Sequence, residues 1–323
     1  MNWKNFKIIN LENKDEWKSI VKNNFHFSGQ TWDYNKLQEI SSKLETYLLH
    51  FKDNKKEYFF PFHKKKYKNF EYIFSPKGYT GFNQLIDEKL YTKLLSYLRH
   101  KGFITAFIKL NPFIFNKNDQ LFLKAIKKNI SYFIDLSNDL EKIRQNYKKS
   151  LVRSIKKAHD KNFRIRQYND NDYLEVKKIY IECLKNFKIN NDDNISLNEI
   201  NFLFNEYESK ECFVATKNNE IFAVIFFLIG SNTCDYYITV SKKNYNFLSS
   251  FLIDCSYEHL IKKGIYKINL GGSVINKPGI EQYKKSFRSN QSPSKYLEII
   301  LNQDMYDFNC IDGTTFPTFK ENE

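Results

Sequence analysis

Residues 268–287 read INLGGSVINKPGIEQYKKSF, and this stretch decides how the C-terminal half of the chain is interpreted. The apolar run at 265–270 predicts a strand that ends at the paired glycines Gly271 and Gly272. Glycines at a strand end let a backbone or a ligand approach closely, because no side chain stands in the way. A proline–glycine pair then precedes a short predicted helix, which places Lys284 just beyond that strand end.

A second informative segment is 132–166, where a predicted strand leads into a basic helix. Ser137 follows the strand and is suited to cap the helix, and acidic residues occupy the expected first turn. From 142 to 166 the segment holds ten lysines and arginines against one acid, Asp160. The helix is expected to run to about Ala158.

A third segment, FSPKGYTGF at 74–82, predicts a strand end followed by a turn. Taken in order, the three segments resemble the FemABX family of aminoacyltransferases, which build peptidoglycan cross-bridges, and related acyltransferases of surface-glycan gene clusters. The family pattern is a PxGYxG turn, an IDL-S strand end before a basic helix, and a Gly-Gly strand end before a GL..FK..FG helix. The chain departs from that pattern at Tyr283, where the family has Phe, and at Arg288, where it has Gly.

The resemblance implies an α/β fold with mixed sheets, made of two tandem GNAT-like domains (the acyl-CoA N-acyltransferase fold) without a coiled-coil arm. We predict a first domain at 1–138, a connecting basic helix at 139–160, and a second domain at 161–323 that carries the donor site.

The hydrophobic pattern predicts the individual elements. In the first half we expect strands at 6–10, 46–52, 58–62, 72–75 and 104–110, helices at 12–24 and 87–102, and an aromatic loop at 25–33. In the second half we expect strands at 163–168, 212–217, 221–230, 233–240, 265–270 and 295–301, and helices at 170–187, 196–208, 248–263 and 281–287. Ser196 and Glu199 have the spacing of a capping box at the start of the 196–208 helix.

The composition indicates the class of partner. The 323 residues carry a formal net charge of +14, and most of the basic residues are lysines. Frequent lysine, asparagine and isoleucine are typical of an AT-rich genome, but the sign of the charge still favours anionic partners such as nucleotide-linked precursors, tRNA or an anionic membrane surface. No apolar signal segment opens the sequence, and its longest apolar run, 221–229, is too short to span a bilayer, so we expect a bacterial cytoplasmic protein, with a peripheral place at the inner membrane face left open.

Metal and disulfide chemistry are not indicated. The five cysteines have no CxxC spacing, which predicts buried free thiols, and the six histidines lack zinc-like spacing. We expect no metal and no tightly bound cofactor, with acyl-CoA or aminoacyl-tRNA as co-substrate.

The reaction that the resemblance implies is amide formation, in which an amine attacks an ester or thioester carbonyl. Such a site needs a donor for the oxyanion, a route for the amine proton and cations for phosphates. Lys284 matches the lysine of the family's FK..F motif, and the resemblance implies that it meets the developing negative charge or the donor phosphate. Lys285 takes that role if the motif is shifted by one residue. The alternative is a solvated helix lysine.

Other candidate residues are assigned from their spacing. Arg153 and Lys157, one helical turn apart, share a face that either contacts phosphates or is simply solvated. Asp235 and Tyr237 are predicted on one side of their strand; Asp235 would accept the amine proton, unless it is a solvated carboxylate at a strand end.

Three further substrate-binding candidates are Tyr79, Lys242 and Ser249. Tyr79 is placed at the acceptor groove, with core packing as the alternative. Lys242 and Ser249 flank the start of the 248–263 helix, where GNAT enzymes hold the CoA pyrophosphate, although the glycine-rich turn of those enzymes is missing here.

Three functions remain open. The first is an acyltransferase that acylates an amine of a nucleotide- or lipid-linked cell-envelope precursor, from aminoacyl-tRNA onto a peptidoglycan stem peptide. The second transfers an acyl group from acyl-CoA to a nucleotide-linked amino sugar for a surface polysaccharide. The third is a non-catalytic RNA-binding or scaffold pair. A monomer is expected in each case.

Overall fold

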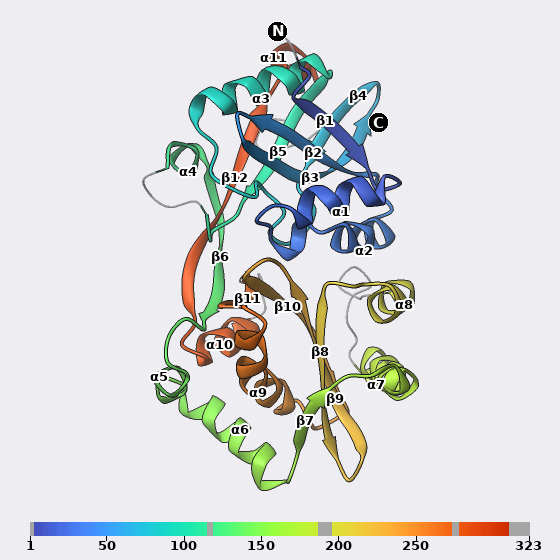
Figure 1. Ribbon diagram of the computed structural model, residues 1–323, viewed down its shortest axis with the longest axis vertical. Coiled ribbons are helices and arrows are strands. Elements are labelled where there is room, and N and C mark those ends of the chain that lie inside the picture. Colours follow the sequence, from blue (N-terminus) through green and yellow to red (C-terminus); the bar gives the residue numbers. More distant parts are fainter. Residues whose placement is uncertain (1–2, 115–118, 187–195, 273–277, 310–323) are drawn as a thin grey trace. The chain divides into compact units, whose positions relative to one another are not determined.

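The chain forms two compact units in the computed structural model, which describes residues 3–114, 119–186, 196–272 and 278–309 (Figure 1). One unit holds the residues up to Ile130 together with those from Ser292 onward, and the other holds Ser131–Gln291. Each unit contains a run of neighbouring parallel and antiparallel strands flanked by helices, which confirms the predicted α/β class.

The first unit contains a sheet in the order β1-β2-β3-β4-β5-β12, in which β4 and β5 are parallel and the other neighbours antiparallel. Its strands are β1 (Phe6–Asn10), β2 (Thr46–Asp53), β3 (Lys56–Tyr67), β4 (Phe70–Phe74), β5 (Phe103–Leu110) and β12 (Asn290–Ile300). Its helices are α1 (Lys14–Lys22), η1 (Ser28–Gln30), α2 (Trp32–Ser42), α3 (Glu88–His100), α4 (Gln120–Lys124) and α11 (Gln303–Asn309).

The two faces of this sheet are buried by different helices, because successive residues of a strand point to opposite sides. On one face, Leu49 and Phe60 pack with Leu94 of α3. On the other, Leu48 and Phe59 pack with Trp17 of α1. Helix α2 was not predicted, since its buried positions include the polar residues Asp33, Asn35 and Gln38 rather than an apolar stripe.

The second unit contains a sheet in the order β6-β11-β10-β9-β8-β7, in which only β10 and β11 are parallel. Its strands are β6 (Ile126–Asp135), which begins in the first unit, β7 (Arg164–Gln167), β8 (Lys210–Lys217), β9 (Glu220–Ile229), β10 (Thr233–Ser241) and β11 (Lys267–Gly272). Its helices are α5 (Leu140–Gln145), α6 (Lys149–Asp160), η2 (Asp170–Asp172), α7 (Tyr173–Asn186), α8 (Leu197–Asn205), α9 (Leu248–Lys262) and α10 (Pro278–Ser286).

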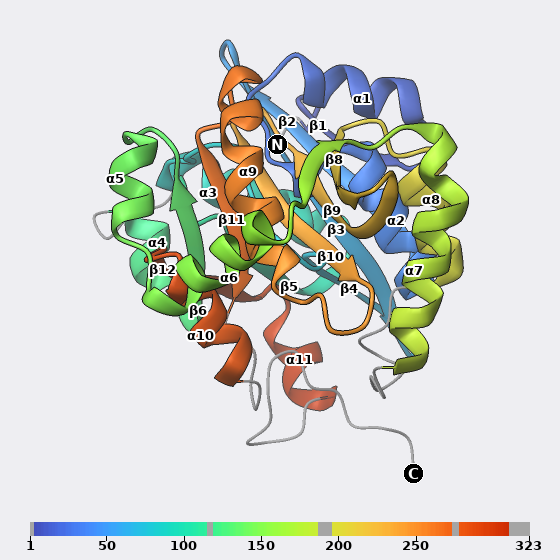
Figure 2. The same cartoon turned by 90° about the horizontal axis from the view of Figure 1, so that it is seen from below.

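Helices α7 and α8 lie on one face of this sheet and α9 lies on the other, as Figures 1 and 2 both show. Helix α6 packs on the outside of α9. The capping box predicted at Ser196 is confirmed, because Ser196 Oγ accepts from the Glu199 amide and Glu199 Oε2 accepts from the Ser196 amide. The longest helix of the described ranges, α9, has 15 residues.

The single basic helix predicted after residue 137 is wrong. Asp139, rather than Ser137, caps the short helix α5, and the chain breaks before α6 begins at Lys149. The break places Tyr147 in the core with 8% of its surface exposed. Its hydroxyl finds hydrogen-bond partners inside the unit, in Asp254 and Tyr257, as buried tyrosines usually do.

The division into units differs from the predicted one in two places. The basic helix α6 is part of the second unit, packed on α9, rather than a connector. Strand β12, predicted in the second domain, pairs with β5 from Lys295↔Leu110 to Ile300↔Thr105 and so joins the strands of the first unit. A strand's alternation predicts that it pairs but not with which partner.

Replacing Gly81 by alanine is expected to destabilise the first unit. The new Cβ would lie 1.8 Å from the backbone oxygen of Lys109, and that backbone belongs to strand β5. We expect a loss of roughly 1–3 kcal/mol or more in the free energy of unfolding, measured by urea denaturation. The control is Gly279→Ala in α10, where a Cβ meets nothing within 4 Å among the described residues and helix propensity improves. Equal unfolding midpoints for the two variants would contradict this packing.

Candidate functional site

Strands β10 and β11 diverge soon after they meet. They pair only from Thr233↔Lys267 to Asp235↔Asn269. Beyond that point, the register of β10 against β9 shifts between Tyr236 and Ile238. The register of β11 against β6 shifts between Asn269 and Gly271. Bulges of this kind bend a strand and increase its twist, so the carboxyl ends of these two parallel strands open into a fork.

The predicted glycine pair forms one side of this fork. Gly271 has a φ of +81°, a conformation that glycine adopts without the steric penalty of a side chain. Its amide donates to Oδ1 of Asn269 at 2.8 Å, and the side-chain amide of Asn269 donates to Oδ1 of Asp235. Because Asn269 is buried, this chain of bonds fixes both the strand end and one carboxylate oxygen of Asp235.

Lys284 reaches the same strand end from α10. Its Nζ donates to the carbonyl oxygen of Gly272 at 2.7 Å, and a Cβ on Gly271 would lie 3.3 Å from that nitrogen. Only 8% of Lys284 is exposed, and burial lowers the pKa of its ammonium from 10.5 to about 8. Among the described residues no carboxylate lies within ion-pair distance of Nζ, so the site presents an uncompensated cation that favours a negative charge.

Lys285 is used differently. Its Nζ forms an ion pair with Glu281 at 2.6 Å, one turn earlier in α10. Glu281 also accepts a hydrogen bond from the hydroxyl of Tyr132 at 2.8 Å. The carboxylate raises the pKa of Lys285, whose exposed ammonium stays charged. Of the two neighbouring lysines, it is therefore Lys284 that lies at the glycine pair.

Helix α10 is held in place from the break between α5 and α6. The Lys148 amide donates to the carbonyl of Ser286 at 2.9 Å, and the ring of Tyr147 packs edge-on against Phe287 at 5.8 Å. The Tyr147 hydroxyl donates to Oδ1 of buried Asp254 at 2.8 Å, and Nε of Arg144 donates to the same oxygen at 3.1 Å. This buried network anchors the C-terminal end of the helix that carries Lys284.

Asp235 and Tyr237 lie on β10, as predicted, and β10 forms one side of the fork. The two residues are not related as residues i and i+2 of a regular strand are. The register shift falls at Tyr237, so simple alternation no longer decides which side its ring occupies. Burial, together with the nearby Glu199 and Tyr180, raises the pKa of the Tyr237 hydroxyl, which therefore stays protonated at neutral pH.

The predicted phosphate-binding residues are only partly brought together. Nζ of Lys157 lies 4.6 Å from the ring centroid of Phe247, which precedes α9, and Ser249 is in the first turn of that helix. Arg153 is exposed and pairs with no described residue. Lys242 forms an ion pair with Glu220, and Glu175 lies 3.9 Å away, so its charge is largely neutralised.

Tyr79 lies in the first unit and is a packing residue there. Only 2% of it is exposed, its ring meets Phe113 edge-on at 5.8 Å, and Nζ of Lys109 lies 4.6 Å from the ring centroid. The glycines around it are required by close contacts, since Gly78 has a φ of +83° and lies against the hydroxyl of Tyr34.

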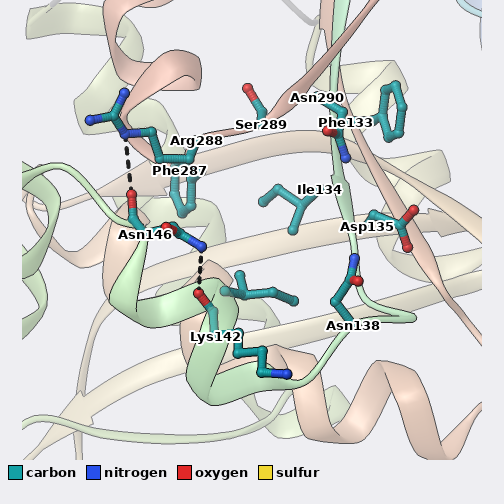
Figure 3. A pocket seen from close by; sticks show the side chains of 11 residues that line it. Phe133, Ile134, Asp135, Asn138, Lys142, Asn146, Phe287, Arg288, Ser289 and Asn290 are labelled. Carbon is teal, nitrogen blue, oxygen red and sulfur yellow. Dashed lines mark hydrogen bonds between the residues drawn. The ribbon is translucent and has the colours of Figure 1, made fainter.

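Several residues of the second unit were not predicted from the sequence. Asn269, Tyr147 and Asp254 carry no local signal, because each acts through partners far along the chain. A polar pocket beside α5 was also missed (Figure 3). Its amide side chains are unremarkable in a sequence this rich in asparagine.

The described part of the chain has neither a cluster of metal-ligating side chains nor a membrane-spanning helix. No group of three or more His, Cys, Asp or Glu side chains there is arranged to hold a metal ion. No helix there has the length and apolarity needed to cross a bilayer. The four described cysteines are free thiols, of which Cys212 and Cys234 are buried, and Cys310 lies outside the described residues.

Comparison with solved structures identifies the fold. The crystal structure of FemX matches 92% of this chain and 98% of its own with a TM-score of 0.70 and 8% sequence identity. The C-terminal domain of a putative lysylphosphatidylglycerol synthetase from Agrobacterium fabrum matches 91% of this chain and 93% of its own (TM-score 0.57, 14% identity). L-PGS from Bacillus licheniformis matches 90% of this chain and 92% of its own (TM-score 0.57, 10% identity). No family model and no curated protein matches the sequence.

The chain therefore has the fold of FemX, and the resemblance predicted from its three sequence segments is confirmed at the level of fold. The mixed α/β arrangement in two units, each with its own strands and helices, agrees with the predicted fold class. At these identities the likeness concerns the fold alone.

The two lysines of α10 are expected to titrate far apart. In protein labelled with ¹³C-lysine, the side-chain signal of Lys284 should shift with a midpoint near pH 8, because burial disfavours its ammonium. The Lys285 signal should titrate above pH 10.5, because Glu281 stabilises its charge. Lys284→Arg and Lys285→Arg assign the two signals by their loss. Midpoints above pH 10 for both would mean that Lys284 is solvated.

Proposed function

We propose that this protein is an acyltransferase of the FemABX type, which forms an amide on an amine of a cell-envelope precursor. The observation that carries the proposal is the buried ammonium of Lys284 at the fork of β10 and β11, which lacks a described carboxylate partner. The likeness to FemX over nearly the whole chain supports it.

Lys284 suits the chemistry of the transfer. A neutral amine attacks the activated carbonyl, the new C–N bond forms, and negative charge develops on the carbonyl oxygen. A preformed cation in a water-poor site stabilises that oxygen without having to reorganise. The C–O bond of an ester, or the C–S bond of a thioester, then breaks, and the leaving group takes up a proton equivalent to the one that the amine has lost.

Asp235 is the proposed acceptor of the amine proton. Oδ1 of Asp235 is held by the amide of Asn269, which is bonded in turn to the Gly271 amide near Lys284. A carboxylate fixed in this way is oriented before substrate arrives, which lowers the reorganisation that proton transfer requires.

The proposed donor is an aminoacyl-tRNA. Lys242, expected at a CoA pyrophosphate site, is paired with acids instead, and the start of α9 has neither a side-chain cap nor a glycine-rich turn. The net charge of +14 suits a polyanionic donor. The name of one similar structure, a lysylphosphatidylglycerol synthetase domain, describes an aminoacylated lipid. The proposed setting is the bacterial cytoplasm, where the protein acts as a monomer on a nucleotide- or lipid-linked acceptor.

Changing Lys284 to alanine should lower kcat by roughly a hundred-fold or more, the range seen when one oxyanion-stabilising group is lost. The matched control is Lys285→Ala, which removes a neighbouring lysine paired with Glu281 and should stay near wild type. Lys284→Arg should restore activity only in part, because the guanidinium is wider than an ammonium. Transfer from charged tRNA and from labelled acetyl-CoA is measured in parallel.

Three outcomes would contradict this proposal. Near-wild-type turnover in both alanine variants would remove Lys284 from the reaction. A defect confined to Lys285→Ala would move the role by one residue. Transfer from acetyl-CoA but not from any charged tRNA would replace the proposed donor.

A further inference from the structure

A polar pocket of about 560 Å³ lies in the second unit, and neither Gly272 nor Lys284 is among its lining residues (Figure 3). It is enclosed by the end of β6, by α5, and by the residues that follow α10. Its polar lining residues are Asp135, Asn138, Lys142, Asn146, Arg288, Ser289 and Asn290. The proposed acyl transfer uses none of them.

The negative side of the pocket is pre-oriented. Asp135 Oδ1 accepts from the amide of Ser137 at 3.0 Å and from its hydroxyl, which fixes the carboxylate at the strand end. Its second oxygen, Oδ2, has no partner among the described residues, and the neighbouring Asn138 side chain is likewise unbonded there. One oxygen of Asp135 is thus available to a hydrogen-bond donor, at little further loss of side-chain freedom.

The positive side is built in the same way. Nε of Arg288 donates to the carbonyl oxygen of Asn146 at 3.2 Å, and the two amino nitrogens of its guanidinium have no partner among the described residues. Arg288 has a φ of +53°, a conformation that a glycine would adopt more easily. Nζ of Lys142 is a second cation of the lining, unpaired in the described part of the chain, and Figure 3 shows it toward Asn138 rather than beside Arg288.

Apolar side chains lie between the two charged sides. Ile134 and Phe287 are 3% and 2% exposed, and Ile143 is half-buried beside them. Figure 3 shows Arg288 and Asp135 at opposite sides of the pocket, with Phe287 and Ile134 between them. The pocket therefore offers a cation, an apolar floor and an anion in sequence.

We infer that this pocket binds the zwitterionic form of a short apolar peptide. Its carboxylate would meet Arg288, its ammonium would meet Asp135, and its side chains would cover Ile134 and Phe287. A guanidinium matches a carboxylate through two parallel hydrogen bonds. A phosphate would be repelled by Asp135 and a diamine by the two cations, so the mixed lining selects a ligand that carries both charges.

The test is calorimetric titration of the full-length protein with L-alanyl-L-leucine, its N-acetyl derivative and its C-terminal amide. The free dipeptide should bind at least about ten-fold more tightly than either blocked form, the effect of one charged hydrogen bond. Arg288→Gln should weaken binding of the free dipeptide and abolish the protein's preference for it over the C-terminal amide. Asp135→Asn should abolish the protein's preference for the free dipeptide over the N-acetyl derivative.

The matched controls are Arg164→Gln and Asp160→Asn, exposed residues of the same unit outside the pocket lining, which should bind like wild type. Lys284→Ala should also bind like wild type, which separates this inference from the acyl-transfer proposal. Equal binding of free and blocked peptides, unchanged preferences in the two pocket variants, or tighter binding of inorganic phosphate than of dipeptide would overturn the inference.

Discussion

The contact between the Lys284 ammonium and the carbonyl oxygen of Gly272 is the interaction on which the functional account depends. An ammonium taken out of water without a carboxylate is unfavourable, and a single neutral acceptor offsets only part of that loss. The lowered pKa of Lys284 expresses the same imbalance. Gly271 makes the contact possible, since its positive φ turns the strand end and its missing Cβ leaves room for the lysine. The site is consequently ready to receive negative charge.

The surrounding structure keeps this lysine where it is. Register shifts open β10 and β11 at the glycine pair, and Asn269 ties that strand end to Asp235. On the other side, the break between α5 and α6 places Tyr147 against Phe287, just beyond the end of α10. Through Tyr147 and Arg144, which both donate to Asp254, the break between α5 and α6 is anchored to α9 and supports the end of α10. The same break lets the Asn146 carbonyl hold Arg288 at the polar pocket.

The sequence predicted the features that have local causes. Gly271, Gly272 and Lys284 follow from a strand end and a helix start, and the Ser196 capping box follows from residue spacing. Helix α2 was not predicted because it buries polar side chains through hydrogen bonds, such as that of Asn35 to the Gly29 carbonyl, which no hydrophobic pattern reveals. The pairing of β12 with β5, and of Tyr147 with Asp254, joins positions far apart in the chain. The ion pair of Lys242 with Glu220 likewise joins positions that are far apart in the chain.

The central claim is that the protonated, partly dehydrated Lys284 acts in the reaction. The pH dependence of kcat/KM for amide formation tests it most directly, because this parameter reports the titration of groups in the free enzyme and the free substrates. On the acidic side of the profile, kcat/KM should increase with increasing pH as the acceptor amine loses its proton. It should then fall through about pH 8 as Lys284 loses its own proton, and this falling limb should move to higher pH in Lys284→Arg. A rate that keeps rising to pH 10, or a falling limb unchanged by Lys284→Arg, would contradict the account.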